Sequence, residues 1–274
     1  MTDFKEFNLM TVPLVSILMG VYNGEKTLSR SIDSVKRQTF FNWEFIIFND
    51  GSTDNTSTIL KRYSDEDPRI HILNGRGKNG LASGLNQCLF VAKGKYIARM
   101  DDDDISLPER LFKQVDYLEK HNNVDAVGSS MIVFDECGEK GIRHNDVLIT
   151  KKSFLKGSPF FHPTIMIKRK VLKDLNGYRT DVGRTEDLDL WFRFFQGGYV
   201  GCNLQEPLLK YHENITDYSK RTIRNGLLAT YVTFSGYKNI DISLINRWRA
   251  FRPLISSLIP KKLMKKYHEF KLDR

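Results

Sequence analysis

The chain has 274 residues, of which 41% are hydrophobic and 27% are charged, so it can bury a core and does not belong to the disordered class. Its formal net charge of +9 invites a nucleic-acid or anionic-membrane partner. However, 13 of the 42 basic residues but only 3 of the 33 acidic ones lie at Lys220 or beyond. The rest of the chain therefore has 29 basic and 30 acidic residues. The excess charge therefore belongs to a C-terminal segment that follows a nearly neutral body.

Strand and helix patterns alternate over the first hundred residues. Predicted strands cover 12–19, 43–48, 69–73 and 96–100, and predicted helices cover 25–38, a segment around Ile59 and Leu60, and 81–92. This alternation predicts an α/β fold with a Rossmann-like, mostly parallel, doubly wound sheet flanked by helices. Because ligands bind beyond the carboxyl ends of such strands, we expect the loops 22–24, 49–52 and 101–104 to meet at one edge.

The pattern changes after Pro108. We expect a helix to about His121, strands at 126–134 and 165–167, and a helix over 187–195. From about residue 217 the sequence predicts helices, with breaks near Gly236, Pro253 and Pro260. The sequence thus indicates a main domain over 1–216, with halves at 12–104 and 105–216, and a basic helical C-terminal segment over 217–274.

The cysteines and the apolar stretches exclude other classes. Cys88, Cys137 and Cys202 lie far apart without CxxC spacing, which supports neither a disulfide scaffold nor a zinc knuckle. The N-terminal residues do not have the apolar region of a secretory signal, and no stretch approaches the ~20 apolar residues of a membrane span. We therefore expect a cytoplasmic protein, either soluble or peripheral on the inner face of the cytoplasmic membrane.

Four adjacent aspartates, 101–104, give the strongest local signal. Adjacent carboxylates repel one another, and a hard divalent cation such as Mg²⁺ or Mn²⁺ relieves that repulsion. The alternative is a solvated acidic turn before the helix that begins near Pro108. The position at the end of a predicted central strand favours the metal.

Three further segments carry weaker signals. The segment Asn49-Asp50-Gly51-Ser52 is typical of a turn followed by a helix cap. Alternatively, its carboxylate could bind the base or ribose of a nucleotide. Residues 75–80, with Lys78, could hold phosphates but do not have the spacing of a Walker A loop. Glu186, Asp187 and Asp189 begin an apolar helix, where they could complement its dipole or supply a general base.

Together these motifs resemble glycosyltransferase family 2, over roughly residues 12 to 212 and in the family's order. The matching segments are Val15-Ser16-Ile17 to Tyr22-Asn23, Asn49 to Ser52, Met100 to Asp104 with Pro108-Glu109-Arg110, His162-Pro163-Thr164, and Glu186 to Trp191. The resemblance implies the GT-A fold and transfer of a sugar from a nucleotide-sugar donor with inversion. The domain over 1–216 is then the catalytic domain, with its nucleotide-sugar-binding half at 12–104 and its acceptor-binding half at 105–216.

The resemblance also assigns roles to residues. Tyr22 and Asp50 match residues that contact the donor base and ribose. Including Lys78 of the possible phosphate loop, the expected donor-binding set is Tyr22, Asn23, Asp50, Lys78, Asp101 and Asp102. Asp103 and Asp101 match the metal-binding Asp-x-Asp motif, although this chain has Asp102 where the family usually has a small residue. Asp187 matches the catalytic base, with Glu186 beside it as the second candidate. His162 and Trp191 are placed on the acceptor side.

The C-terminal segment alternates cations with apolar and aromatic residues, as in Arg247-Trp248-Arg249. This pattern is typical of a segment that lies on an anionic membrane surface, and it also fits helices packed on the catalytic domain. We therefore expect a metal-dependent transferase that uses a UDP-sugar and a glycan or lipid-linked glycan acceptor in bacterial surface polysaccharide synthesis of the O-antigen or capsule type. The alternatives are a nucleotidyltransferase that makes sugar nucleotides and a nucleic-acid-binding protein, of which the second is disfavoured by the acidic loops.

Overall fold

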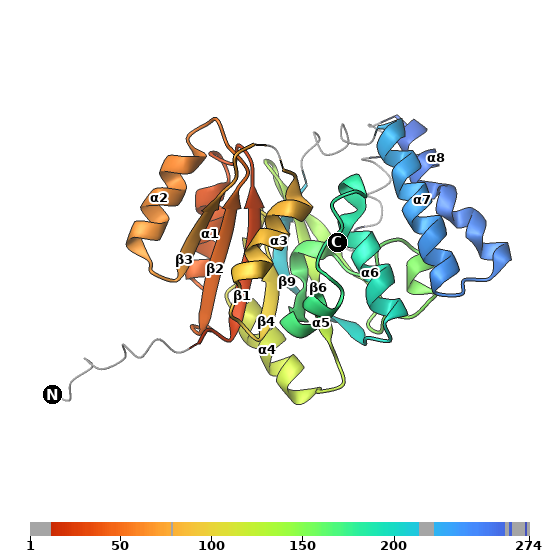
Figure 1. Cartoon of the computed structure of the whole chain (residues 1–274), viewed down its shortest axis with the longest axis horizontal. Helices are drawn as coiled ribbons and strands as arrows, with labels where there is room; N and C mark the ends of the chain where they lie inside the picture. The colour runs from red at the N-terminus through yellow and green to blue at the C-terminus, as the bar shows by residue number, and fades with distance from the viewer. Residues whose placement is uncertain (1–11, 78, 214–221, 261–262, 265–271, 273–274) are drawn as a thin grey trace.

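A computed structural model describes residues 12–77, 79–213, 222–260, 263, 264 and 272. Within them, one nine-stranded sheet runs through the molecule and helices cover both of its faces (Figure 1). The strands are β1 (Val15–Val21), β2 (Trp43–Asn49), β3 (Ile70–Asn74), β4 (Tyr96–Arg99), β5 (Ile105–Ser106), β6 (Ala126–Asp135), β7 (Gly138–Arg143), β8 (Met166–Lys168) and β9 (Gly201–His212). The predicted α/β fold class is confirmed.

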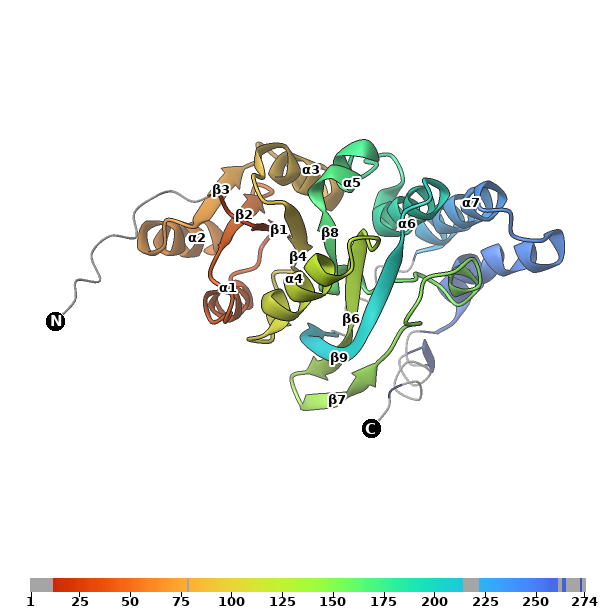
Figure 2. The same ribbon diagram turned by 90° about the horizontal axis from the view of Figure 1, so that it is seen from below.

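The helices follow the strands in alternation and then gather at the C-terminal end. The α-helices are α1 (Leu28–Lys36), α2 (Thr56–Glu66), α3 (Leu81–Val91), α4 (Arg110–Lys120), α5 (Arg169–Asp174), α6 (Glu186–Gln196), α7 (Ile223–Asn239) and α8 (Arg252–Leu258). Short 3₁₀ helices are η1 (Ser153–Leu155), η2 (His162–Thr164), η3 (Gly183–Thr185) and η5 (Leu244–Phe251). Figure 2 shows α3 and α5 on one face of the sheet and α1 and α4 on the other.

The strand order is β3-β2-β1-β4-β8-β6-β9-β5, and β7 pairs with the C-terminal half of β6, beyond the residues that pair with β8. The first four strands are parallel, as their continuous apolar runs predict, and all seven residues of β2 are buried. Beyond β4 the sheet is mixed, because β8 runs antiparallel to both β4 and β6. The carboxyl ends of β1, β2 and β4 thus share one edge, where the predicted loops begin.

The sequence patterns did not indicate β9, the longest strand. Its polar middle, Gln205-Glu206-Pro207, breaks the apolar alternation, and the pairing with β6 shifts register at Ser129 to Met131. A bulge of this kind interrupts the period of two that identifies a strand. The strand matters for the site because it ends at His212.

The C-terminal helices extend the core of the domain. The helix break predicted near Gly236 is wrong, because α7 continues to Asn239. A Cβ atom at Gly236 would lie 2.3 Å from the Phe192 ring, so glycine allows α7 to approach α6 closely. The Tyr237 hydroxyl donates to the Phe154 carbonyl at 2.9 Å. The predicted boundary at 216/217 falls within 214–221, outside the described residues.

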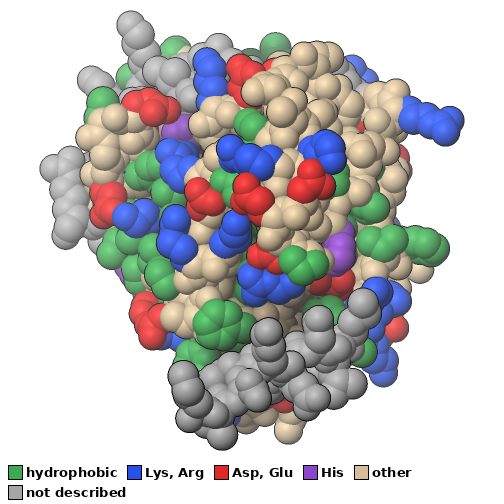
Figure 3. Space-filling view, turned by 90° about the vertical axis from the view of Figure 1, so that its left-hand side faces the viewer, with side chains coloured by type: hydrophobic (Ala, Val, Ile, Leu, Met, Phe, Trp, Pro, Cys, Tyr) green, Lys and Arg blue, Asp and Glu red, His purple; other side chains and the backbone are tan. Residues whose placement is uncertain are grey.

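Charges of both signs are interspersed on the end of the molecule that carries α2 and β3 (Figure 3). Pairs on α2 such as Lys61–Asp65, at 2.9 Å, are part of this pattern. In the part of the chain that the structure describes, no helix is long and apolar enough to cross a membrane.

Candidate active site

The loops after β1 and β2 are bonded to each other. The Asn23 N–H donates to the Ser52 hydroxyl at 3.0 Å, and the Asn23 side-chain oxygen accepts from the Thr53 N–H at 2.9 Å. Asn23 holds φ of +56°, a conformation that asparagine tolerates better than most residues. Asn23, predicted on the donor side, therefore shapes the loop that presents Tyr22, whose side chain is 40% exposed.

Asp50 connects the β2 loop to the segment before α3. Its carboxylate accepts from the backbone N–H groups of Asn79 at 2.8 Å and Gly80 at 2.9 Å. The residue is 9% exposed, so these bonds compensate much of the cost of burying the carboxylate. Lys78, the predicted phosphate cation, lies outside the described residues.

The acidic loop after β4 is held by α1 and by the strand itself. The Ser31 hydroxyl lies within 2.7 Å of the Asp101 carbonyl and 2.8 Å of the Asp104 carbonyl, and Arg30 donates to the Asp103 carbonyl at 3.0 Å. The Asp101 carboxylate pairs with the buried guanidinium of Arg99. The loop backbone is thus fixed independently of any ligand.

The carboxylates of this loop form a compact group. Asp101, Asp103 and Asp104 each offer an oxygen, and these oxygens lie within 4.8 Å of one another. Burial, together with the charges of Asp103 and Asp101, raises the pKa of Asp102 to about 7. Burial and the same two neighbouring carboxylates raise the pKa of Asp104 well above its ordinary value.

Two buried polar atoms beside the group have no hydrogen-bond partner among the described residues. They are Oδ2 of Asp104, whose Oδ1 accepts from the His212 N–H at 2.9 Å, and Nδ1 of His212, which lies 3.6 Å from the Asp103 carboxylate. Clustered oxygens with an adjacent imidazole nitrogen fit a hard divalent cation. Asp104 was predicted only as part of the acidic run 101–104 and not as one of the two ligands. His212 was not in the predicted metal set, since only the bulged strand β9 brings it to this loop.

The second acidic pair begins α6. Glu186 is 8% exposed, and its Oε2 has no hydrogen-bond partner among the described residues. Burial, with the neighbouring charge of Asp187, raises the pKa of Glu186 to about 7. Burial also raises the pKa of Asp187, although Asp187 accepts the Leu188 N–H at 2.7 Å. A carboxyl with a raised pKa is a suitable general base near neutral pH.

Arg99, at the end of β4, links the two acidic groups. Burial has the larger effect and raises the pKa of Glu186 and of Asp187, whereas the positive charge of Arg99 lowers both pKa values. The negative charge of Asp101 also raises the pKa of Asp187. The acidic loop and the α6 pair therefore both lie within electrostatic range of Arg99. The sequence alone could have indicated that Arg99 is a functional residue, because it is a charged residue at the end of an otherwise apolar strand.

The residues predicted on the acceptor side lie beneath the surface. His162 is 8% exposed, and its Nε2 lies 3.1 Å from the Tyr178 hydroxyl. Burial and then the charge of Arg99 lower the pKa of His162 well below its ordinary value, so the ring is neutral. Trp191 is fully buried, with its ring centroid 4.5 Å from that of Phe160. Trp191 could therefore act on an acceptor only through the residues that cover it.

Comparisons with known proteins agree with this geometry. The model of the family "Glycosyl transferase family 2" matches residues 16–176. EpsE of Bacillus subtilis (strain 168) is 40% identical over 260 residues, which cover 94% of each chain. The O-antigen biosynthesis glycosyltransferase WbnJ of Escherichia coli is 33% identical over 251 residues, covering 82% of this chain and 96% of WbnJ.

Solved structures share the fold at low identity. TarS 1–349 of S. aureus in complex with UDP superposes with a TM-score of 0.68 and 17% identity, over 88% of this chain and 70% of TarS. The mannosyltransferase PcManGT of Pyrobaculum calidifontis, in complex with GDP-Man and Mn²⁺, gives a TM-score of 0.62 and 19% identity, over 94% of this chain and 80% of PcManGT.

Proposed function

The chain belongs to glycosyltransferase family 2, and we propose that it moves a sugar with inversion from a nucleotide-sugar, with UDP as the expected nucleotide, to a glycan acceptor in surface polysaccharide synthesis. The observation that carries this proposal is the pair of acidic groups arranged around Arg99, one suited to a cation and one to a base. TarS was solved with UDP, PcManGT was solved with GDP-Man and Mn²⁺, and WbnJ is named for O-antigen biosynthesis. These relatives support the classes of donor and product.

On the donor side, the loops with Tyr22 and Asp50 form the nucleotide site. Asp50 would act there chiefly by holding the Asn79–Gly80 backbone in place, because its oxygens already accept those N–H groups. Asp101 and Asp103 would hold a divalent cation, with Asp104 and His212 beside them. The bound cation would stabilise the negative charge that develops on the departing diphosphate.

On the acceptor side, Asp187 is the proposed base. A sugar hydroxyl has a pKa far above 7, so attack on the anomeric carbon is faster when a carboxylate accepts its proton as the bond forms. A single displacement from the face opposite the diphosphate inverts the anomeric configuration, so an α-linked donor gives a β-linked product. Glu186 remains the second candidate for the base because it directly precedes Asp187 in the chain and its pKa is about 7.

The base assignment is tested by Asp187→Asn beside Glu186→Gln. We expect Asp187→Asn to lower the transfer rate by about 10²–10⁴-fold and to leave Mn²⁺-dependent binding of UDP intact, since Asp187 is not one of the proposed cation ligands. A screen of nucleotide-sugars for nucleoside diphosphate release identifies the donor for this assay. Pyrophosphate as the product would instead support the nucleotidyltransferase alternative. Full turnover by Asp187→Asn would refute the assignment.

The C-terminal helices supply a proposed membrane contact. Leu244 and Ile245 of η5 are 78% and 81% exposed, Trp248 is 58% exposed, and Arg247 lies among them. Aromatic and aliphatic side chains beside cations favour an anionic interface. Ile245→Glu should reduce flotation with anionic vesicles, whereas Phe90→Glu, at an 87% exposed site on α3, should not. Equal flotation by both variants would refute the proposed contact.

A further inference from the structure

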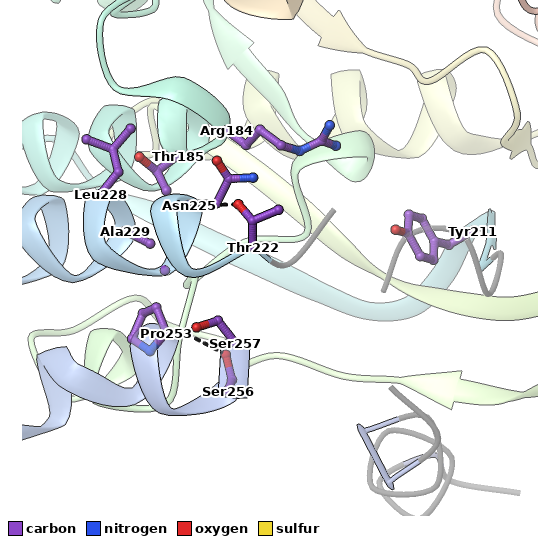
Figure 4. A pocket seen from close by; sticks show the side chains of 11 residues that line it. Arg184, Thr185, Tyr211, Thr222, Asn225, Leu228, Ala229, Pro253, Ser256 and Ser257 are labelled. Atoms are coloured by element: carbon purple, nitrogen blue, oxygen red, sulfur yellow. Dashed lines mark hydrogen bonds between the residues drawn. The ribbon is translucent and has the colours of Figure 1, made fainter. Parts of the chain in front are cut away.

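His212, the last residue of β9, lies on the face of that strand that is turned toward the acidic loop. Its neighbour Tyr211 lines a polar cavity together with Arg184 and Thr222 (Figure 4). Because successive side chains of a strand lie on opposite faces, the His212 ring is on the other face of β9. There its side chain is 5% exposed, and the ring lies between the acidic loop and the turn that joins β6 to β7.

The end of β6 and the turn that follows contact this ring at two points. Phe134 is the register partner of His212 in the pairing of β6 with β9, and the two ring centroids are 5.1 Å apart. Two residues further on, Glu136 places a carboxylate oxygen 3.1 Å from Nε2 of His212. Arg30 lies 5.0 Å from the Phe134 ring centroid and donates to the Asp103 carbonyl, so α1 connects this end of β6 to the acidic loop.

The contact with Glu136 decides which ring nitrogen of His212 carries the proton. An exposed carboxylate accepts hydrogen bonds and does not donate them at neutral pH, so Nε2 is the donor. In the neutral ring, Nδ1 then keeps its lone pair. Nδ1 is buried, has no hydrogen-bond partner among the described residues, and lies 3.6 Å from the Asp103 carboxylate. Two electron-rich groups at this separation repel each other unless a cation binds both.

Proteins aim a histidine at a metal ion in the same way, since a metal-binding ring almost always donates its other N–H to a carboxylate, a carbonyl or water. We propose that Glu136 is a positioning residue, which fixes the tautomer and the direction of the His212 ring and thereby raises the affinity of the acidic loop for a divalent cation. This inference rests on the proposed function, because that cation is the one expected to bind the donor diphosphate.

The first test measures Mn²⁺ binding to the full chain, without nucleotide, from the loss of the EPR signal of free Mn²⁺. Glu136→Ala should weaken binding by about tenfold, the lower end of what loss of such an outer partner costs. Glu136→Gln should stay within about threefold of the wild type, because its amide oxygen still accepts the Nε2 proton.

Glu139→Ala is the matched control for the lost charge. Glu139 is on the same hairpin, and its carboxylate pairs with Lys210 at 2.6 Å. We expect Glu139→Ala to bind Mn²⁺ as the wild type does. Equal affinities of Glu136→Ala and the wild type, equal losses in Glu136→Ala and Glu139→Ala, or no binding to the wild-type chain would each overturn the proposal.

The second test has a readout that a merely structural role would not change. Long-range ¹H–¹⁵N correlation NMR of the metal-free chain at about pH 8.5 reports which ring nitrogen is protonated, and comparison with His212→Gln assigns the signals. We expect the proton on Nε2 in the wild type and in Glu139→Ala, and both tautomers in Glu136→Ala. The urea midpoint of Glu136→Ala should not change, because that side chain is 80% exposed. A proton on Nδ1 in the wild type, or an unchanged tautomer in Glu136→Ala, would overturn the proposal.

Failure of the proposed function gives a different result. Release of nucleoside diphosphate from a nucleotide-sugar is measured separately, with and without Mn²⁺. No release by the wild-type chain, together with the expected loss of Mn²⁺ affinity in Glu136→Ala, would refute the proposed function and support the role of Glu136. Mn²⁺-dependent release by the wild type, with equal Mn²⁺ affinities of the wild type and Glu136→Ala, would refute only the role of Glu136.

Discussion

Glu186→Gln should make the protein more stable at alkaline pH. In the folded protein the Glu186 carboxyl is buried, Oε2 has no hydrogen-bond partner among the described residues, and the charge of Asp187 lies next to it. All three conditions oppose ionisation. Glutamine has nearly the same shape and cannot ionise, so the substitution removes the titration with little change in packing.

The magnitude follows from the pKa of Glu186, about 7 in the folded protein against an ordinary 4.5. At about 1.36 kcal/mol per pKa unit, this difference corresponds to ~3 kcal/mol of folding free energy. Because the pKa is raised by folding, the proton stabilises the folded state fully below pH 4.5, and this contribution is lost as the pH rises through about 7. The wild-type chain loses this free energy and the variant does not.

Urea unfolding of both proteins at about pH 5 and about pH 8.5 measures the effect. We expect the variant to exceed the wild type by about 2–3 kcal/mol at the higher pH, and to differ by less than about 1 kcal/mol at the lower. Glu139→Gln is the control, since that carboxyl is 55% exposed and pairs with Lys210 on the surface. If the difference in unfolding free energy between Glu186→Gln and the wild type were the same at both pH values, the surroundings of the Glu186 carboxyl would not be keeping it protonated.

Three further substitutions test the donor side. Asp103→Ala should weaken Mn²⁺-dependent UDP binding by about tenfold or more in isothermal titration, because it removes a proposed ligand; unchanged affinity would exclude Asp103 as a ligand. Asp104→Ala leaves the buried His212 N–H without its acceptor and should cost about 1–3 kcal/mol of unfolding free energy in urea; an unchanged midpoint would mean that this bond does not stabilise the fold. Gly24→Ala places a methyl group 2.5 Å from Oδ2 of Asp102, so we expect this variant to bind UDP more weakly than the wild type while its circular dichroism spectrum stays normal. Wild-type affinity for UDP would show that the acidic loop can move to accommodate the methyl group.

The features predicted best from the sequence are those that depend only on residues close together in the chain. The continuous apolar runs of β1, β2 and β4 locate the parallel half of the sheet, and the loops at their ends follow from topology. The contact between Asp104 and His212 could not be predicted, since the two residues are 108 positions apart and meet only through the bulged pairing of β9 with β6. Gly236 was misread for a related reason. A glycine that ends a helix and one that admits the Phe192 ring have the same local pattern, and only the packing partner distinguishes them.

Arg99 also bears on the order in which ligands bind. It is a buried cation that pairs with Asp101 and whose charge also acts on Glu186 and Asp187. The four carboxyls of the acidic loop and the two of the α6 pair outnumber Arg99 and its buried neighbour Arg110. A nucleotide diphosphate that approaches alone is repelled by this excess, whereas one that arrives with a divalent cation, or after it, is not. We therefore expect apparent nucleotide affinity to track the free cation concentration, which would make occupancy of the site depend on two solutes at once.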